Sequence, residues 1–422
     1  RSHELWLKKP EILKHYQQRF NHLLVDEFQD TNTVQYAWLR VLAGNSCKVT
    51  AVGDDDQSIY GWRGAKIENI QRFSEDFPDT QITKLEQNYR STETILKAAN
   101  EVISRNQGRL GKELWTAGEQ GEKISLYAGF NEVDEANFIV EQIQQAPEDV
   151  AKSDCAILYR SNAQSRVLED SLLRAGVPYR VYGGHRFYER LEIKNALSYL
   201  RLLNNPHDDI AFERVINTPT RGIGAKSVEN LRLFAREHGS SLWQSANVMT
   251  EKKLLPARAA SNIANFLQLL ADLTEGTTEL PLHEQVDHII EASGLLEFHR
   301  NEKGEKGQAR VENLQELVVA TRAFAWDEDE NGTPLQQFLD TAALDAGDAQ
   351  ADEFEDAVQL MTLHSAKGLE FHTVFMAGVE ENLFPHKMSI EEPGRLEEER
   401  RLCYVGITRA KVKLYISYAE CR

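Results

Sequence analysis

His22-Leu23-Leu24-Val25-Asp26-Glu27-Phe28-Gln29-Asp30 joins a short apolar run to two adjacent carboxylates. The apolar run is typical of a strand in a parallel sheet, and ligands bind outside the carboxyl ends of such strands. We therefore expect Asp26 and Glu27 to face a ligand rather than the core. Two carboxylates at this point suit Mg²⁺-dependent hydrolysis of a nucleoside triphosphate, in which one serves the metal and the other activates water.

The phosphate-binding loop that such a carboxylate pair needs does not occur in this sequence. No stretch of the 422 residues reads Gly-x-x-x-x-Gly-Lys-Ser/Thr. Two interpretations stay open: the carboxylates have another role, or the chain starts in the middle of a larger ATPase. The chain begins at Arg1 without an initiator Met, and we expect it to be cut from a longer protein.

Composition limits the class of protein. A chain of 422 residues with 41% hydrophobic and 27% charged residues predicts two or three globular domains. No segment reaches the roughly 18 consecutive apolar residues of a membrane span, and the N-terminus does not have the pattern of a signal peptide. We expect no membrane association. The net charge of −18 argues against coating nucleic acid by bulk electrostatics, although a narrow basic or aromatic track stays possible.

Cysteine spacing indicates the compartment. The four cysteines form no Cys-x-x-Cys pair: Cys47, Cys155, Cys403 and Cys421. A metal cluster or a disulfide framework is therefore not expected, and a reducing cytoplasm is the expected location.

Strand and helix patterns alternate over the first 183 residues. After a helical stretch at 1–20, the apolar runs predict strands at 22–25, 48–52, 81–85, 123–130, 155–159 and 179–182, and helices at 92–104, 132–145 and 163–175. Residues 184–356 are almost wholly helical in pattern. Strands are predicted again at 358–363, 373–377 and 414–418, with a helix at 395–405. The pattern predicts an α/β protein with parallel sheets, in which one α/β domain (87–183 and 357–422) is interrupted by a large helical insertion.

The stretch 52–64 is a second candidate site, read as Val-Gly-Asp-Asp-Asp-Gln-Ser-Ile-Tyr-Gly-Trp-Arg-Gly. Gln57 could orient a water molecule or a γ-phosphate. Tyr60 and Trp62 could stack on bases, each stack contributing about 1–3 kcal/mol. The alternative is that Trp62 is an ordinary core residue, and the flanking glycines favour the loop interpretation over a buried helix.

Two further stretches end in polar residues. In Leu85-Glu86-Gln87-Asn88-Tyr89-Arg90-Ser91, Arg90 could reach a γ-phosphate and Tyr89 could stack on adenine, or both could be ordinary surface residues. In 362–371, read as Thr-Leu-His-Ser-Ala-Lys-Gly-Leu-Glu-Phe, the small and hydroxyl residues suit contacts to phosphates. His364 is not expected to bind metal, because no partner stands at ligand spacing.

The stretch 397–410 is read as Glu-Glu-Glu-Arg-Arg-Leu-Cys-Tyr-Val-Gly-Ile-Thr-Arg-Ala. Most of its charges are expected to lie on the wet face of a helix. Arg409, which follows Gly406 and Thr408, is the candidate arginine finger.

In this order the motifs closely resemble those of the UvrD/Rep/PcrA group of superfamily 1A DNA helicases. Each motif alone is moderately specific, but the ordered set is highly specific, and the resemblance extends over essentially the whole chain. It implies two RecA-like parallel sheets, the first partial and the second complete with a helical insertion.

The resemblance also implies domain boundaries. Residues 1–20 would end an inserted subdomain of motor domain 1, and 21–86 would form the C-terminal half of that domain. Residues 87–183 and 357–422 would form motor domain 2, with 184–356 as its mobile, duplex-contacting insertion. The phosphate loop and the early DNA-contact motifs of the family lie upstream of Arg1 in relatives.

Family roles map onto matching residues of this chain. By resemblance Asp26 serves Mg²⁺, Glu27 activates water, Gln57 senses the γ-phosphate, Arg90 and Arg409 clamp phosphates, and Tyr89, Gly368 and Glu370 contact the nucleotide. Single-stranded DNA is expected at Tyr60, Trp62, Arg63, Arg160, His364 and Ser365, and duplex phosphates at Thr220, Gly222 and Gly224.

The implied activity is ATP-dependent 3′–5′ translocation on single-stranded DNA and unwinding of duplex. The implied cofactors are ATP and Mg²⁺. The implied partners are single-stranded DNA, single-strand/duplex junctions and DNA repair proteins, in mismatch and nucleotide excision repair, at the nucleoid of the cytoplasm. The alternative is that the chain by itself is a non-catalytic DNA-binding or partner-docking module. For lack of the phosphate loop, we expect the isolated chain to be inactive as an ATPase.

Overall fold

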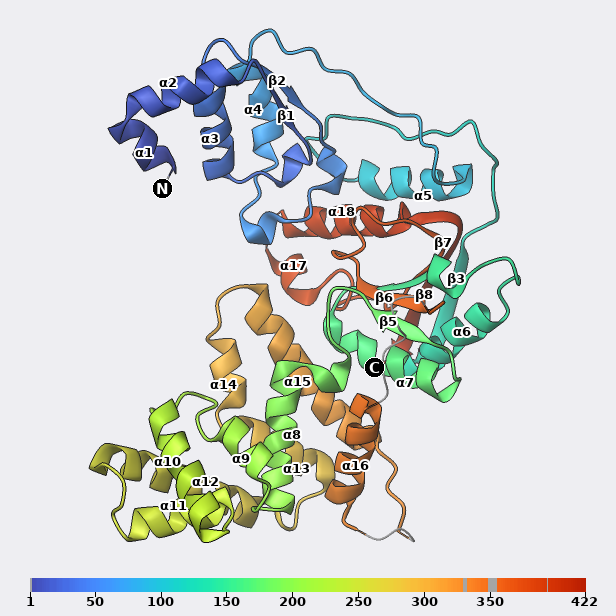
Figure 1. Cartoon of the computed structure of the whole chain (residues 1–422). Helices are drawn as coiled ribbons and strands as arrows, with labels where there is room; N and C mark the ends of the chain where they lie inside the picture. Colours follow the sequence, from blue (N-terminus) through green and yellow to red (C-terminus); the bar gives the residue numbers. More distant parts are fainter. Residues whose placement is uncertain (1, 329–331, 348–354, 393) are drawn as a thin grey trace. The chain divides into compact units, whose positions relative to one another are not determined.

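The computed structural model of the chain describes residues 2–328, 332–347, 355–392 and 394–422 (Figure 1). The chain divides into two compact units. The first contains Arg1–Arg160, Asp170–Gly183 and Glu355–Arg422, and the second contains Ser161–Glu169 and Gly184–Phe354. Residues 161–169 thus belong with the helical unit, whereas the sequence pattern placed them with the sheet.

A small sheet lies near the start of the first unit. Strands β1 (His22–Val25) and β2 (Lys48–Ala51) pair in parallel, with Leu24 opposite Thr50. Four helices precede or follow these strands: α1 (Ser2–Lys8), α2 (Pro10–Arg19), α3 (Thr33–Ala43) and α4 (Glu68–Asp76). The core here is a small aromatic cluster in which Phe28 packs edge-on against Tyr36 and Phe73.

The strand expected at 81–85 is absent, which corrects the sequence prediction. The segment runs without regular pairing, and a single parallel bridge joins Gln87 to Trp115. Ile82 and Leu85 are exposed, so the apolar side chains that suggested a strand do not enter a core. The Lys84 ammonium donates instead to the carbonyls of Leu110 and Gly111.

A six-stranded parallel sheet forms the centre of the first unit, in the order β3-β8-β7-β4-β6-β5. Its strands are β3 (Ser125–Asn131), β4 (Cys155–Tyr159), β5 (Tyr179–Val181), β6 (Val358–Thr362), β7 (Phe371–Met376) and β8 (Ala410–Cys421). β4 is buried along its whole length, as its uninterrupted apolar sequence predicts. Because β4 and β6 are neighbours, Arg160 and His364 follow the carboxyl ends of adjacent strands.

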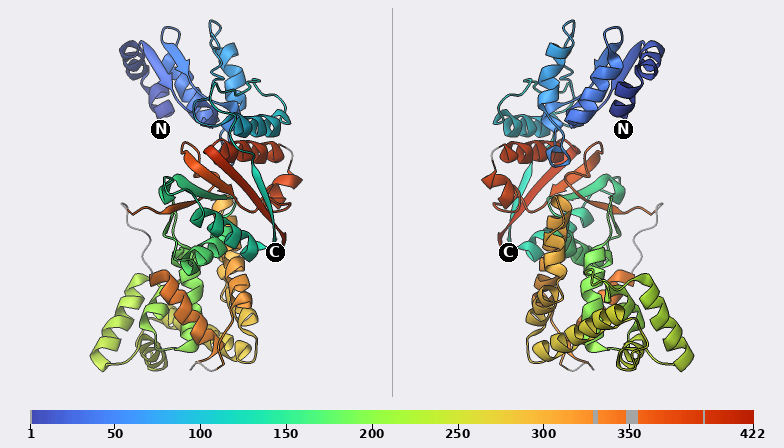
Figure 2. Two further views of the ribbon diagram at one scale, coloured as in Figure 1. Left: turned by 90° about the vertical axis from the view of Figure 1, so that its right-hand side faces the viewer. Right: turned by 90° about the vertical axis from the view of Figure 1, so that its left-hand side faces the viewer.

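Helices cover both faces of this sheet. Figures 1 and 2 show α5 (Glu93–Ser104) and α18 (Arg395–Ile407) on one face and α6 (Glu132–Gln144) on the other. Helix α7 (Ser165–Arg174) is divided between the two units, with Asp170–Arg174 in the first, and the short helix α17 (Lys387–Glu391) also belongs to the first unit. The core between α5, α18 and the sheet also contains Ile59, which is fully buried there. The loop that contains Gln57 and Trp62 is therefore fastened to the larger sheet by an apolar side chain.

The second unit is helical, and its described residues contain no strand. Its helices are α8 (Leu191–Asn204), α9 (Asp209–Val215), α10 (Ala225–His238), α11 (Leu242–Glu251), α12 (Ala257–Thr277), α13 (Leu282–Ala292), α14 (Leu295–Arg300), α15 (Glu305–Ala323) and α16 (Pro334–Gly347). They share one large apolar core that includes Tyr199, Phe212 and Phe266. Among the helices that the structure describes, none has the length and apolarity to span a membrane.

Candidate active site

Asp26 and Glu27 stand directly after β1, where the chain leaves the small sheet. Both side chains are exposed, and the backbone of Glu27 is left-handed, with a φ of 48°. The Glu27 amide donates to Asp26 Oδ1 at 2.9 Å, and no described residue donates a hydrogen bond to Asp26 Oδ2. An exposed carboxylate with free lone pairs fits a Mg²⁺ ligand.

Gln29 holds this loop to the next one. Its side chain is fully buried, its amide nitrogen donates to Glu27 Oε2, and its amide oxygen accepts from the Asp54 amide at 3.0 Å. The carboxylate of Glu27 is therefore positioned by a residue two places along the chain. The sequence contained Gln29 within the quoted motif, but no periodicity marked it as a positioning residue.

The three consecutive aspartates after β2 lie close together, with ligand atoms within 4.8 Å of one another. Each carboxylate already has partners: Asp54 pairs with Lys112, Asp55 accepts from the Leu110 amide, and Asp56 accepts twice from Arg109 at 2.7 Å. These pairs tie residues 109–112 to the loop. We therefore assign the cluster a structural role. Gln57, the predicted γ-phosphate sensor, donates to Asp54 Oδ2 at 2.6 Å.

Lys367 joins the loop after β6 to residues 26–30, which we call the carboxylate loop. Its almost fully buried ammonium lies 3.1 Å from Glu27 Oε2 and 2.7 Å from Asp30 Oδ2, and it donates to the Gln57 carbonyl at 3.0 Å. It also lies 5.2 Å from the centre of the Tyr60 ring. Burial raises the pKa of Asp30, while the bond to Lys367 opposes that rise. No role was predicted for Lys367 from its motif, because its partner Asp30 lies 337 residues away in the chain.

Arg90 and Glu370 form an ion pair, with Arg90 Nε 2.6 Å from Glu370 Oε2. Lys411 approaches the other oxygen of Glu370 at 3.1 Å. Hydrogen bonds from Arg90 and then from Lys411 lower the pKa of Glu370. Arg90 also donates to the Thr408 carbonyl at 3.3 Å, which places it beside Arg409 in the chain.

Arg409 is buried and bonded mainly to its own surroundings. Its guanidinium donates to the carbonyls of Val405 and Leu369 at 3.0 Å and to Thr408 Oγ1 at 3.1 Å. Burial, followed by the nearby charge of Arg90, lowers the pKa of Arg409 to about 10. The residue remains charged at neutral pH, and it also supports the strand that it precedes.

Tyr89 and Gly368 are the two predicted nucleotide contacts that the structure leaves outside any cluster. Tyr89 is exposed, and its hydroxyl donates to Gln87 Oε1 at 2.9 Å. Gly368 has a φ of 86°, and a β-carbon built on it would meet nothing within 4 Å. The open space beside Gly368 is compatible with a ligand.

Tyr60, Trp62, Arg63 and His364 form an aromatic cluster. The centre of the Tyr60 ring lies 6.4 Å from the centre of the Trp62 ring and 6.5 Å from that of His364. The Arg63 guanidinium lies 4.5 Å from the Trp62 ring centre. Trp62 is 40% exposed, which is too open for a core residue. An exposed indole next to an arginine and a tyrosine offers a surface for stacking bases.

Electrostatics around His364 keep its ring neutral. Burial, with a contribution from Arg160, lowers the pKa of His364 to about 3. Arg160 itself makes a two-pronged contact with Glu399, with N–O distances from 2.8 to 3.1 Å. Ser365 contacts Thr362, with 3.0 Å between the hydroxyl oxygens. Of the expected DNA contacts, His364 thus joins the aromatic cluster, whereas Arg160 is engaged by a carboxylate.

The glycine-containing turn of the helical unit links α9 to α10. Gly222 has a φ of 73°, and Gly224 precedes the first residue of α10. The Asn217 side chain accepts from the amides of Arg221 and Ile223, at 2.8 and 3.1 Å. Thr220 is exposed at the start of this turn.

The site residues therefore fall into four groups: the carboxylate loop with Gln57, the Arg90–Glu370 pair beside Arg409, the aromatic cluster, and the glycine turn. Lys367 contacts both the first and the third group. Comparison with family models then decides the relationship. Residues 1–78 match the UvrD/REP helicase N-terminal domain, and residues 83–421 match the UvrD-like helicase C-terminal domain.

The chain belongs to the UvrD-like helicase family. It is 60% identical over 424 residues to DNA helicase II of Escherichia coli (strain K12), covering 100% of this chain and 59% of that relative. It is 61% identical to DNA helicase II of Salmonella typhimurium, with the same coverage. It is 44% identical to the ATP-dependent DNA helicase PcrA of Bacillus subtilis, covering 99% of this chain and 57% of that relative.

Membership of the family confirms the resemblance and the α/β class with parallel sheets. The chain spans about 59% of the length of the first two relatives, so an activity that their names describe belongs to a longer polypeptide.

Proposed function

We propose that this chain is the larger part of an ATP-dependent DNA helicase that moves 3′ to 5′ on single-stranded DNA and unwinds duplex. The experiments use a longer protein in which this chain is joined to a phosphate-binding loop. We call it the loop-bearing protein. One observation carries the proposal: the Lys367 ammonium contacts Glu27 and lies beside Tyr60. The carboxylate proposed for hydrolysis and the ring proposed for DNA thus share one partner, which supports coupling between them.

The proposed chemistry assigns each charged group one task. Asp26 would hold Mg²⁺ and Glu27 would take a proton from the attacking water, while Gln57 would sense the γ-phosphate. Arg90 and Arg409 would neutralise charge that develops on the transferred phosphoryl group. The bound ion would supply Lewis-acid stabilisation of the phosphate oxygens.

Nucleotide recognition is proposed at residues outside the carboxylate loop. Tyr89 would stack on adenine, and its full exposure leaves the ring face available. Gly368 would admit the nucleotide, and Glu370 would accept from the ribose. Because Glu370 pairs with Arg90, nucleotide binding would exchange that ion pair for new contacts.

The proposed DNA contacts separate single strand from duplex. Trp62 and Tyr60 would stack on bases, while Arg63, Arg160, His364 and Ser365 would follow the strand. The turn at Thr220, Gly222 and Gly224 would offer backbone amides to duplex phosphates. Stacking and a narrow groove explain how a chain with a net charge of −18 can grip DNA.

The wider biological setting is also a proposal. The proposed domain segments are those predicted from the sequence: 1–20, 21–86, 87–183, 184–356 and 357–422. Residues 161–169 are assigned instead to the helical insertion. Single-strand/duplex junctions are the proposed substrates, repair proteins the proposed partners, and the nucleoid of the cytoplasm the proposed location.

Unwinding by the loop-bearing protein tests the proposal. Duplexes with a 3′ tail, a 5′ tail or no tail are incubated with ATP and Mg²⁺, and strand separation is followed by fluorescence. We expect unwinding of the 3′-tailed duplex only, and none with ADP or with EDTA. Equal unwinding of the 5′-tailed duplex would overturn the polarity, and no unwinding of any duplex would overturn the function.

The second candidate is a non-catalytic DNA-binding module, which the chain could be in isolation. The comparisons do not favour it, because the relatives that match along the whole chain are named as helicases.

A further inference from the structure

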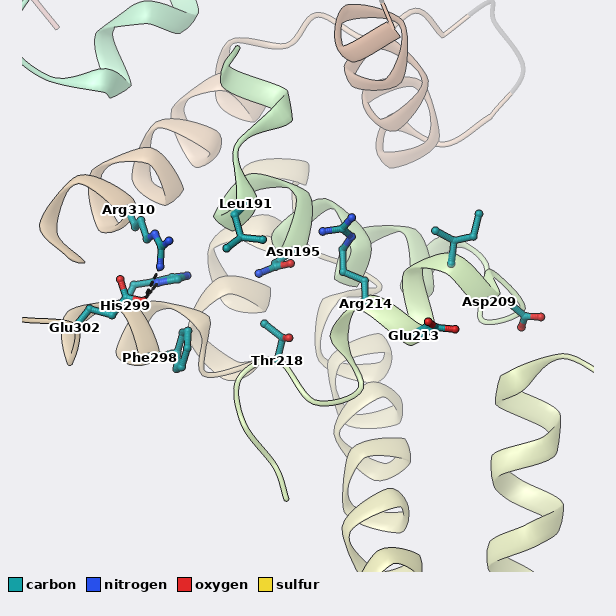
Figure 3. Close-up of a pocket in the computed structure, with 11 residues that line it drawn as sticks. Leu191, Asn195, Asp209, Glu213, Arg214, Thr218, Phe298, His299, Glu302 and Arg310 are labelled. Atoms are coloured by element: carbon teal, nitrogen blue, oxygen red, sulfur yellow. Dashed lines mark hydrogen bonds and ion pairs between the residues drawn. The ribbon is translucent and has the colours of Figure 1, made fainter. Parts of the chain in front are cut away.

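A cavity of about 690 Å³ lies within the helical unit, between α8, α9, α14 and α15 (Figure 3). Its size falls within the range of about 300–1,000 Å³ that is typical of small-molecule sites. None of the roles proposed above uses it. All residues that line it belong to the second unit.

Two buried polar side chains in this cavity lack hydrogen-bond partners among the described residues. His299 is 1% exposed, and neither of its ring nitrogens forms a hydrogen bond with a described residue, although Nδ1 lies 3.6 Å from Glu302 Oε1. Asn195 is 5% exposed, and its side-chain amide forms no hydrogen bond with a described residue. Figure 3 shows Phe298 and His299 facing Asn195 and Thr218 across the cavity. An unpaired buried polar group costs about 1–3 kcal/mol, so a ligand that pairs with these groups would be favoured.

Charge in the lining argues for a neutral ligand. The lining contains three carboxylates (Asp209, Glu213, Glu302) and two guanidinium groups (Arg214, Arg310). Glu302 is held by Arg310 at 2.6 Å, and Glu213 pairs with Arg232. Burial lowers the pKa of His299, which keeps that ring neutral as well. An anion would therefore meet excess carboxylate, and a cation would meet Arg310 and Arg214.

The shape and polarity of the lining suit a flat ring with a polar edge. Leu191 and Phe298 provide apolar surface, and Phe298 is 37% exposed. Asn195 offers both a donor and an acceptor, and Glu302 Oε2 is a buried acceptor without a partner. Nucleobases carry donors and acceptors on one edge, and they stack on aromatic side chains.

We propose that this cavity binds a nucleobase, with Phe298 against the face of the ring and Asn195, His299 and Glu302 along its edge. Arg214 lines the cavity without an ion pair to another described residue and would approach the sugar. Thr218 also lines the cavity and precedes the turn at Thr220 by two residues. An unpaired nucleotide of bound DNA is therefore one source of the base, and a free nucleoside is the other.

Ligand-observed NMR on the 422-residue chain tests the site without requiring helicase activity. Adenosine, guanosine, cytidine and uridine are titrated, with ribose as the control ligand. We expect at least one nucleoside to bind and ribose not to bind. Phe298→Ala and Asn195→Leu should each weaken that binding at least tenfold.

A control variant separates this site from the rest of the helical unit. Leu233→Ala removes another exposed apolar side chain of that unit and should change nucleoside affinity less than twofold. If Asn195→Leu fails to fold, Phe298→Ala and Arg214→Ala decide the test. Binding that Phe298→Ala leaves unchanged, or no binding of any nucleoside or of the bulged DNA below, would overturn the proposal.

A second experiment asks whether the bound base comes from DNA or from a free nucleoside. It rests on the proposed DNA binding. A tailed duplex carries one unpaired 2-aminopurine next to the junction, and its fluorescence is measured on binding. A quench that Phe298→Ala removes, with DNA affinity unchanged, assigns the base to DNA. Nucleoside binding without such a quench assigns the cavity to a free nucleoside. Loss of DNA binding in the unsubstituted chain would count against the proposed function and leave the nucleoside arm as the test of the cavity.

Discussion

Glu27 occupies the left-handed backbone region, which costs a residue with a β-carbon roughly 1–2 kcal/mol. Gln29 and Lys367 stabilise this conformation through the Glu27 carboxylate. The cost is compatible with a functional position, because strained residues gather at sites where a side chain must be aimed.

Glu27→Gln in the loop-bearing protein tests the water-activating role. The amide keeps the shape of the side chain but cannot accept the proton, so we expect turnover to fall by about 10²–10⁴-fold. ATP and DNA affinities should be unchanged, as measured by fluorescent-nucleotide and DNA titration. Glu68→Gln, an exposed substitution on α4, is the matched control. Turnover within tenfold of the unsubstituted protein would exclude Glu27 from that role.

His364 provides a prediction about pH. Because its pKa is lowered to about 3, the ring is protonated only in strong acid and is neutral at physiological pH. In spectra of ¹³C-labelled histidine, the resonance that His364→Asn removes should not shift between about pH 8 and pH 5. A midpoint near the ordinary value of about 6.5 would show that the ring is solvated and able to carry a charge to DNA.

At the scale of elements, loops that follow strands meet one another. The loop after β6 supplies Lys367 to the loop after β1, and the loop after β2 inserts Ile59 into the core of the larger sheet. Polar and apolar contacts thus fasten the same segments. The position of each loop therefore depends on the few side chains that reach another segment.

Lys367→Met should destabilise the chain by about 1–3 kcal/mol, because it leaves the Asp30 carboxylate buried without its partner. Urea denaturation followed by tryptophan fluorescence measures the change. Adding Asp30→Asn to Lys367→Met should restore part of the loss, since neither charge then remains. Lys66→Met, at an exposed lysine, is the control. Equal stability of the Lys367→Met and Lys66→Met variants would contradict this account.

Trp62→Ala should uncouple DNA from hydrolysis in the loop-bearing protein. Loss of one stacked base is worth about 1–3 kcal/mol, so DNA affinity should fall about 5- to 150-fold and DNA stimulation of ATPase should fall with it. Trp38 on α3 is exposed to nearly the same extent, at 39% against 40% for Trp62. Trp38→Ala is therefore the matched control. Unchanged stimulation by DNA in the Trp62→Ala variant would favour a structural role for this indole.

At the scale of the whole molecule, two units with separate apolar cores divide the proposed tasks. The first contains the carboxylate loop, the arginines and the aromatic cluster, and the second contains the glycine turn and the cavity at Asn195 and His299. Each unit has its own large buried cluster, which favours independent folding of both within the 422-residue chain.

The isolated 422-residue chain should hydrolyse ATP no faster than the background. The sequence does not contain Gly-x-x-x-x-Gly-Lys-Ser/Thr, so the lysine and the backbone amides that such a loop offers to the β- and γ-phosphates are not expected. Phosphate release with and without single-stranded DNA measures this, and the loop-bearing protein is the positive control. DNA-stimulated release by the chain alone, lost in its Glu27→Gln variant, would show that another part of the chain supplies the cradle.

The sequence by itself determined the α/β class, the change to a helical unit near residue 184, and the motifs at strand ends. These depend on local patterns, since apolar runs and polar strand ends are read within a few residues. Local pattern was wrong at 81–85, where Ile82 and Leu85 form an apolar run but gain no sheet neighbour.

Only the tertiary structure decided which of these motifs meet. Lys367 reaches Glu27 and Asp30 across more than 300 residues, Arg160 is engaged by Glu399, and Asn195 faces His299 from another helix. Such contacts arise from packing of the whole chain. No local spacing encodes them, because the energy that selects them is shared among side chains far apart in sequence.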